Sequence, residues 1–176
     1  MVTKKVEKAL NEQIQKEEHS SRLYLGMASW CQREGYQGAA NFLYKQTDEE
    51  RMHMLKLVHY LGDRGGTVNY GKMDALPVGY KTLHDVFEQV LKHEEFISAS
   101  INQLYSVCIG EKDYTSAQYL QWYINEQIEE ESTSRGILDK IRLAGDQKGG
   151  LFMIDKELGE MAALKRTTPP ATGATA

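Results

Sequence analysis

The sequence predicts an all-α fold: an antiparallel four-helix bundle with one long crossover connection and a short C-terminal fifth helix. Three observations support this fold class. The 176 residues include only three prolines, Pro77, Pro169 and Pro170, so two very long stretches contain no obligate helix breaker. Four long segments repeat apolar residues in steps of three and four, the period of an amphipathic helix. Turns that contain glycine separate these segments.

The first two predicted helices cover residues 5–33 and 39–63, and only a short glycine-containing turn lies between them. We therefore expect them to form an antiparallel hairpin. Each helix has polar side chains within its apolar stripe. On the first helix the polar residue within the apolar stripe is Glu17. On the second helix the stripe contains Ala39, Leu43, Gln46, Glu50, His53, Leu57 and Leu61.

The long connection covers residues 65–81, which lack a helical period and contain both glycine and proline. The third helix follows Thr82, whose hydroxyl suits an N-cap. Glu94 lies within the apolar stripe of this helix. The fourth helix has the same pattern, and Gln127 and Glu130 interrupt its stripe. All four long helices thus carry at least one acidic residue on a face that should be buried.

A shorter amphipathic helix is predicted over residues 151–164. It is too short to be a fifth member of the bundle. We expect residues 1–165 to form one domain and residues 166–176, which are small and polar, to be a disordered tail.

The charge and composition of the chain exclude several classes of partner. The chain has 21 basic and 25 acidic residues, a net charge of −4, and no cluster of Lys or Arg. We therefore expect no nucleic-acid and no membrane partner. The first residues lack an apolar signal segment and no run is long enough to span a bilayer, which predicts a cytoplasmic protein. Cys31 and Cys108 lie on apolar stripes and are interpreted as buried reduced thiols.

The acidic interruptions are predicted to lie at one level of the bundle. If the long connection returns the chain to the opposite end, the second and third helices run parallel. Glu50 and Glu94 each lie about twelve residues into their helices, which puts them at one depth for a rise of about 1.5 Å per residue. Glu17 and His53 lie equally far in sequence from the turn at Gly35. Glu130 falls within about one helical turn of the same level.

This arrangement is typical of a carboxylate-bridged two-metal site in a four-helix bundle, where two helices give one Glu each and two give a pair spaced by three residues. Glu17, Glu50, Glu94 and Glu130 supply four negative charges, which two divalent cations would neutralise with His53 as a neutral ligand. Oxygen-rich ligands with one His suit iron, and also manganese or zinc. The alternative is four unrelated solvated glutamates, which would not explain four interrupted stripes at one depth.

With these motifs the sequence resembles the bacterial ferritins over residues 1 to about 165. The resemblance implies two irons per subunit at a ferroxidase centre. Glu17, Glu50 and His53 would bind the first iron, with Glu50 as the bridge. Glu94 and Glu130 would bind the second, with Gln127 nearby. It further implies that Tyr24 and Trp122 are electron-donating aromatic residues beside the centre. Glu49, Glu126 and Glu129 would form a third iron site toward the cavity.

Alternatives remain for these last residues: Tyr24 and Trp122 could serve ordinary packing, and the three glutamates could be exposed surface charges. The pair Gln127 and Glu130 stands where related di-iron proteins have a second Glu-x-x-His. One metal would then lack a His ligand and be held more weakly. Haem is not expected, because bacterioferritins have the haem-binding Met directly after the bridging Glu, where this chain has Arg51.

The resemblance implies a hollow shell of 24 subunits that oxidises Fe(II) with oxygen or hydrogen peroxide and stores the ferric mineral. The apolar face of residues 151–164 needs burial, which is compatible with a homo-oligomer. One rival is a discrete di-iron oxidase or peroxidase that stores no mineral. A second is a helical scaffold or metal buffer without enzymatic activity. Particle size and iron capacity distinguish the three.

Overall fold

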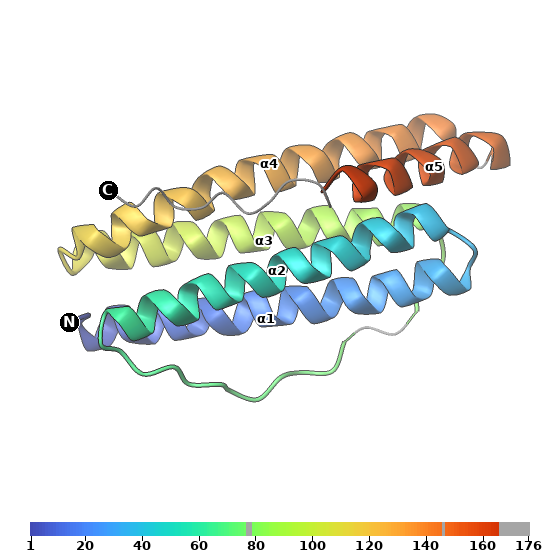
Figure 1. Ribbon diagram of the computed structural model, residues 1–176. Helices are drawn as coiled ribbons and strands as arrows, with labels where there is room; N and C mark the ends of the chain where they lie inside the picture. The colour runs from blue at the N-terminus through green and yellow to red at the C-terminus, as the bar shows by residue number, and fades with distance from the viewer. Residues whose placement is uncertain (77–78, 146, 166–176) are drawn as a thin grey trace.

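The computed structural model describes residues 1–76, 79–145 and 147–165 and contains five helices (Figure 1). The regular structure of these residues is entirely helical, which confirms the predicted fold class. The predicted tail, residues 166–176, lies outside the described residues. The helices are α1 (Lys4–Arg33), α2 (Gln37–Asp63), α3 (Leu83–Gly110), α4 (Tyr114–Ala144) and α5 (Lys148–Lys165).

The long connection between α2 and α3 runs back along the bundle, so that α2 and α3 are parallel (Figure 1). Side chains of α1 hold its first part. Asn11 donates to the carbonyl of Thr67 at 3.0 Å and accepts from the amide of Asn69 at 2.6 Å. Glu7 accepts from the amide of Thr67 at 2.8 Å. These bonds satisfy backbone groups that form no helix of their own.

Polar N-caps fix where the helices begin. Thr3 caps α1, and Thr82 forms a capping box with Asp85 at the start of α3, as the sequence predicted for Thr82. Asp113 caps α4 by accepting a 3.1 Å hydrogen bond from the amide of Ser116. The caps fix the first residues of α1, α3 and α4 and therefore the level at which the acidic residues of these helices lie.

The apolar core is divided into two clusters by a polar layer. One cluster lies toward the α1–α2 turn and includes Tyr24, Leu43, Phe87 and Ile137. The other lies toward the opposite end and includes Leu10, Leu57, Ile101 and Leu120. Between them, in sequence and along the bundle, are the buried residues Glu17, Gln46, Glu50, His53, Glu94, Gln127 and Glu130. The fold thus keeps a set of costly polar side chains in the middle of its core.

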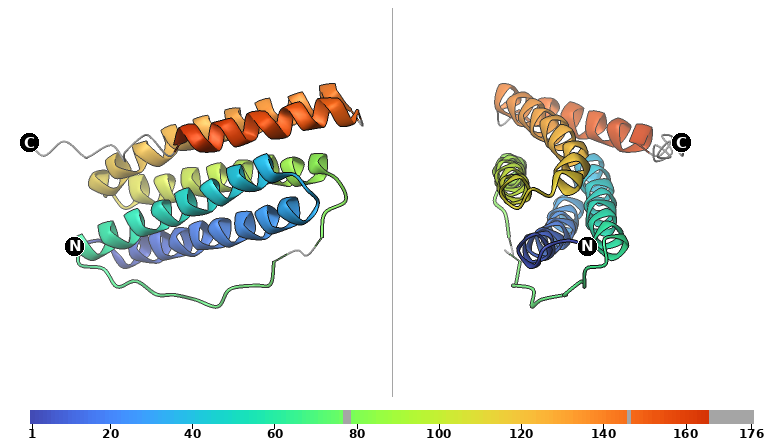
Figure 2. Two further views of the ribbon diagram at one scale, coloured as in Figure 1. Left: turned by 45° about the vertical axis from the view of Figure 1, so that its right-hand side comes forward. Right: turned by 90° about the vertical axis from the view of Figure 1, so that its left-hand side faces the viewer.

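Helix α5 lies outside the four-helix bundle, beside α2 and α4 (Figure 2). It begins at Lys148 rather than at the predicted residue 151, because Gly149 and Gly150 form its first turn, where backbone amides need no partner within the helix. Asp155 accepts a 2.8 Å hydrogen bond from the amide of Ala39 near the start of α2. The close approach of the two backbones requires a residue without a side chain at Gly38.

Cys31 and Cys108 are both buried and unpaired with each other, as predicted. Burial raises the pKa of Cys31 to about 12 and that of Cys108 to about 11, so both are unreactive thiols at neutral pH. None of the described helices has an apolar stretch that could cross a membrane.

Candidate metal centre

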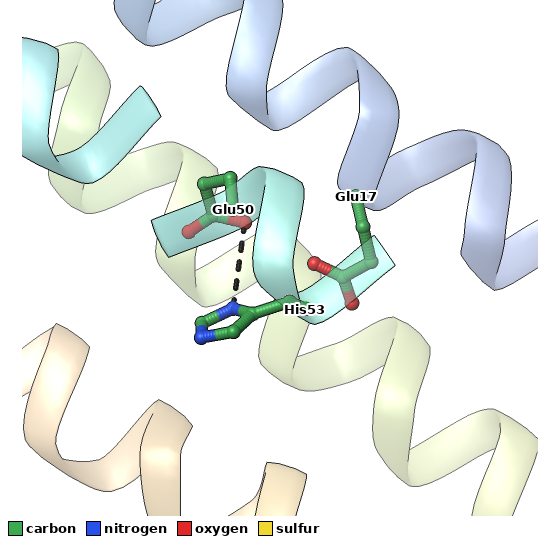
Figure 3. A group of neighbouring side chains, drawn as sticks. All are labelled: Glu17, Glu50 and His53. Atoms are coloured by element: carbon green, nitrogen blue, oxygen red, sulfur yellow. Dashed lines mark ion pairs between the residues drawn. The ribbon is translucent and has the colours of Figure 1, made fainter. Parts of the chain in front are cut away.

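Three of the predicted ligands converge from α1 and α2 in the middle of the bundle. Glu17 on α1 points toward Glu50 and His53 on α2 (Figure 3). One ligand atom from each of the three lies within 4.8 Å of the others. The Nδ1 atom of His53 is 3.7 Å from a carboxylate oxygen of Glu50. All three residues are 1% exposed, so this is a solvent-excluded site with two carboxylates and one imidazole.

The carboxylate of Glu94 reaches the same layer from α3 and is held on both oxygens. The phenol of Tyr24 donates a short hydrogen bond to Oε1. The amide of Gln127 donates to Oε2 at 3.0 Å. Tyr24 and Gln127 therefore contact a predicted ligand directly, and they fix the orientation of its carboxylate.

Glu130 enters the layer from α4 and is also oriented by an amide. Gln46 donates a 2.9 Å hydrogen bond to Oε2 of Glu130 and thereby joins α2 to α4. The structure thus brings Glu17, Glu50, His53, Glu94 and Glu130 into one buried layer, together with Gln127. Each of the four bundle helices contributes, as the spacing of the polar interruptions predicted.

Two residues that the sequence did not single out support Glu17. Gln13 donates to Oε1 of Glu17 at 2.7 Å, and Ser100 on α3 donates to Oε1 of Gln13 at 2.7 Å. Both are buried. The spacing of four residues between Gln13 and Glu17 is a helical signal that could have identified the first contact. The bond from Ser100 crosses between helices and has no such signal.

Two buried side-chain atoms in the part of the chain that the structure describes have no hydrogen-bond partner: Oε2 of Glu17 and Nε2 of His53. Buried polar atoms are almost always paired, so an unpaired one needs an explanation. Both side chains belong to the group of three residues that could hold a cation. A carboxylate oxygen and an imidazole nitrogen are ordinary ligands of iron, manganese and zinc.

Burial opposes the ionised form of these carboxyl groups. It raises the pKa of Glu50 well above its usual value near 4.5, and the neighbouring charges of Glu94 and Glu17 raise it further. Burial likewise raises the pKa of Glu17. It also raises that of Glu94, although hydrogen bonds from Tyr24 and Gln127 oppose the change. Bound divalent cations would supply the missing positive charge, so the metal-free site is electrostatically strained.

A second acidic group adjoins the buried layer. Ligand atoms of Glu49, Glu126 and Glu130 lie within 4.8 Å of one another, with Glu49 and Glu126 half-buried. The third member is Glu130 rather than the predicted Glu129, which is exposed. Glu130 belongs to the buried layer and also to this second acidic group. The flanking site would therefore share a ligand with the main site.

Trp122, the other aromatic residue named from the sequence, packs against a predicted ligand. Its indole meets the ring of His53 edge to face, with 5.2 Å between ring centroids. Tyr123 contacts the same ring at 6.2 Å and donates its hydroxyl proton to the backbone carbonyl of His53 at 2.8 Å. His53 is therefore fixed by aromatic neighbours from α4.

Comparisons with known proteins agree with this geometry. The family model of the ferritin-like domain matches residues 7–144. The bacterial non-heme ferritin of Campylobacter jejuni is 41% identical over 166 residues, which cover 94% of this chain and 99% of that protein. The bacterial non-heme ferritin of Escherichia coli O6:H1 is 40% identical over 152 residues, which cover 86% of this chain and 92% of that protein.

Solved structures with the same arrangement of helices include an open-pore ferritin from the hyperthermophilic archaeon Archaeoglobus fulgidus. It aligns with a TM-score of 0.88 at 37% sequence identity, over 90% of this chain and 96% of that one. An engineered closed form of the Archaeoglobus fulgidus ferritin aligns with a TM-score of 0.89 at 36% identity, over 90% and 97% of the two chains.

Proposed function

This chain belongs to the ferritin family, and we propose that its buried layer of glutamates and one histidine is the centre at which it oxidises iron. It is an iron storage protein with ferroxidase activity. One observation carries the assignment of the site. Glu17, Glu50 and His53 present three ligand atoms within 4.8 Å, and two of these side chains have an unpaired buried atom.

In the proposed centre two Fe(II) ions bind side by side. Glu17, Glu50 and His53 hold the first, Glu94 and Glu130 hold the second, and Glu50 bridges them. Each Fe(II) gives one electron, so the pair reduces O2, with two protons, to hydrogen peroxide. The carboxylates stabilise the increase in positive charge as Fe(II) becomes Fe(III). Hydrogen peroxide would serve as an alternative oxidant.

The centre is asymmetric, because only the first iron has a His ligand. We propose that the second iron, held by carboxylates with Gln127 beside it, is released more readily toward the mineral. Glu49 and Glu126, together with the shared Glu130, would hold a third iron on the flank. Glu129 is exposed and would act only on iron arriving at or leaving this flanking site.

The proposed assembly is a closed shell of 24 subunits around the stored mineral. Large apolar side chains of α5 support burial against other subunits, since Phe152 and Met153 are 67% and 60% exposed. A discrete di-iron oxidase is the rival reading, and its native mass would correspond to one or two subunits of 20.0 kDa. Light scattering separates the two. A cytoplasmic location stays a prediction.

The experiment that tests the proposed centre is stopped-flow absorbance of Fe(II) oxidation by the Glu50→Ala variant. Loss of the bridging carboxylate removes a ligand from both irons, so rapid oxidation should nearly disappear while the helical circular dichroism stays that of the parent. Glu12→Ala, an exposed change on α1, is the control and should oxidise iron at the parental rate. A Glu50→Ala variant as fast as the parent would refute the proposed centre.

A further inference from the structure

A groove between α3 and α4 leads from the protein surface to the buried metal layer. The two helices run side by side (Figure 1), and the groove between them has a volume of about 420 Å³. Gln127 is the lining residue that contacts the layer. It is 5% exposed, and the carboxylate of Glu94, to which it donates, belongs to a residue that is 1% exposed. One amide side chain therefore separates the groove from a predicted iron ligand.

Polar groups form a continuous line along the groove. The guanidinium of Arg135 donates to Oε2 of Glu131 at 3.3 Å, and the hydroxyl of Ser98 donates to Oε1 of the same carboxylate at 2.5 Å. Nε2 of Gln127 lies 3.5 Å from Oγ of Ser98 and 3.0 Å from Oε2 of Glu94. The side chain of Arg135 is 52% exposed and that of Glu131 is 27% exposed. Hydrogen-bonding groups thus follow one another from solvent to the metal layer.

The amide of Gln127 is held unequally by its partners. Its nitrogen carries two protons, and three oxygens lie within reach: Oε2 of Glu94 at 3.0 Å, the backbone carbonyl of Glu94 at 3.3 Å and Oγ of Ser98 at 3.5 Å. The contact with Ser98 is at the long limit of a hydrogen bond. A small molecule that donates and accepts hydrogen bonds can replace this contact and leave the bond that orients Glu94 intact.

The groove does not suit a cation. Its lining includes one acidic and one basic residue, Glu131 and Arg135, which pair with each other. Three isoleucines, Ile101, Ile124 and Ile128, supply apolar walls. A divalent cation would lose its water here without a compensating negative charge, which is costly. A small neutral molecule meets no such cost.

Iron has a different approach to the same layer. The flanking acidic group joins Glu49 on α2 to Glu126 and Glu130 on α4, so it lies between α2 and α4. Gln127 follows Glu126 directly, and adjacent residues on a helix are rotated by about 100° from each other. The acidic approach and the neutral groove therefore open on different sides of α4.

We propose that the groove is the entry route for hydrogen peroxide and that Gln127 is the gate through which this oxidant reaches the iron pair. The proposal rests on the ferroxidase function proposed above. Hydrogen peroxide is small and neutral, and it both donates and accepts hydrogen bonds, as the polar line requires. At the centre its O–O bond breaks as it takes one electron from each of two Fe(II) ions. Two protons complete the two water molecules that form.

O2 differs in the one property that matters for this route. It is apolar and forms no comparable hydrogen bonds, so it gains nothing from the line of polar groups. The proposal therefore predicts that obstruction of the groove slows oxidation by hydrogen peroxide and spares oxidation by O2. The competing explanation is that the groove is an ordinary gap between packed helices, and it predicts no difference between the two oxidants.

The experiment uses the full assembled protein, loaded anaerobically with two Fe(II) per subunit before any oxidant is added. The entry of iron is then complete and does not contribute to the rate. Stopped-flow absorbance follows Fe(III) formation after mixing with hydrogen peroxide or, separately, with O2. The dependence of each rate on oxidant concentration gives a second-order rate constant for each oxidant.

Two variants obstruct the groove at different depths. Ser132→Phe places a ring at the exposed mouth, and Ser98→Leu fills the middle and removes a hydroxyl from the polar line. In both, the rate constant for hydrogen peroxide should fall about tenfold, while that for O2 stays close to the parental value. Ser106→Phe is the control: Ser106 is an exposed serine of α3 outside the groove, and its replacement should change neither rate constant.

The gate itself is tested by the size of the oxidant. tert-Butyl hydroperoxide has the same O–O bond but a bulky group, so the parent should use it slowly. Gln127→Ala widens the passage and should raise the rate constant for this oxidant, relative to that for hydrogen peroxide, about tenfold. Both oxidants meet the same irons, so a weaker second iron in this variant does not produce the change in ratio.

The outcomes separate the route from the centre. A parent that oxidises Fe(II) rapidly with neither oxidant would show that the proposed function is wrong. The route is wrong, and the ferroxidase centre stands, if both obstructing variants keep the parental rate constant for hydrogen peroxide or lose both rate constants in equal proportion. Should Ser132→Phe fail to assemble, Ser98→Leu and the oxidant ratio of Gln127→Ala decide between the two explanations.

Discussion

The amide of Gln127 on α4 donates a 3.0 Å hydrogen bond to Oε2 of Glu94 on α3, while the phenol of Tyr24 on α1 holds the other oxygen of that carboxylate. Three helices thus fix one predicted ligand. Bonds of this kind hold a metal ligand in its binding orientation before the metal arrives. The site is built as much by these neighbours as by the ligands.

The bond from Gln127 should matter for the second iron. The Gln127→Leu variant removes the hydrogen bond to Oε2 of Glu94. We expect Fe(II) to bind the second position of this variant about 10- to 100-fold more weakly. The first position, held by Glu17, Glu50 and His53, should change little. Anaerobic calorimetry with Fe(II) measures both. Gln118→Leu, an exposed change on the same helix, is the control, and equal affinities in the two variants would contradict the role of Gln127.

Stability should depend on pH in the direction opposite to that of a salt-bridged carboxylate. The folded-state pKa of Glu50 lies above its unfolded value near 4.5, because burial and the charges of Glu94 and Glu17 disfavour its ionisation. The folded protein therefore binds more protons than the unfolded chain as pH rises above about 4.5, and stability falls until the folded pKa is passed. Below both pKa values this penalty is absent.

Glu50→Gln removes that titration and keeps the shape of the side chain. The metal-free variant should be more stable than the metal-free parent at pH 7, and the difference should shrink toward pH 5. Denaturant unfolding of both proteins at matched concentration measures this difference. Added Zn²⁺ should stabilise the parent more than the variant at pH 7. A difference that does not change with pH would contradict the account.

The flanking acidic group should add a third, weaker iron. The double variant Glu49→Ala with Glu126→Ala should lose about one of three bound Fe(II) per subunit and keep the two tighter ones, since the geometry places these carboxylates with Glu130. Glu129→Ala should have a smaller effect, because Glu129 is exposed. Anaerobic calorimetry that finds the same number of bound Fe(II) in the double variant and the parent would exclude this site.

Helix α5 should depend on the absence of a side chain at Gly38. A Cβ there would overlap the backbone carbonyl of Asp155, so Gly38→Ala should push α5 off α2 and cost about 1 to 3 kcal/mol. Gly62→Ala is the matched control on the same helix. Its Cβ would meet open space, and it should stabilise the helix by up to about 1 kcal/mol. Thermal unfolding compares them, and equal shifts would disprove the clash.

Much of the fold and most of the site could be predicted because the polar residues follow the helical period. Glu17, Glu50, Glu94 and Glu130 lie on stripes that are otherwise apolar, so the same pattern that gives the helix also gives the buried face. The level of each carboxylate followed from counting residues from the turns. Periodicity within one helix is a local property, and the sequence records it directly.

Contacts between helices could not be predicted in the same way. Ser100 supports Glu17 through Gln13 across a distance in sequence that no spacing rule covers. The hydrogen bond from the amide of Ala39 to Asp155 on α5 likewise joins residues far apart in the sequence, and no spacing rule predicts it. The flanking group includes Glu130 instead of Glu129. Adjacent residues on a helix are rotated by about 100° from each other, and spacing alone did not show which of the two lies near Glu49.

The most direct test of the central claim is anomalous diffraction from crystals of the protein soaked anaerobically with Fe(II), recorded at the iron absorption edge. The account predicts two peaks in each subunit, one within bonding distance of Glu17, Glu50 and His53, the other within bonding distance of Glu94 and Glu130, with Glu50 between them. Iron peaks confined to other parts of the subunit, with none touching Glu50, would contradict it.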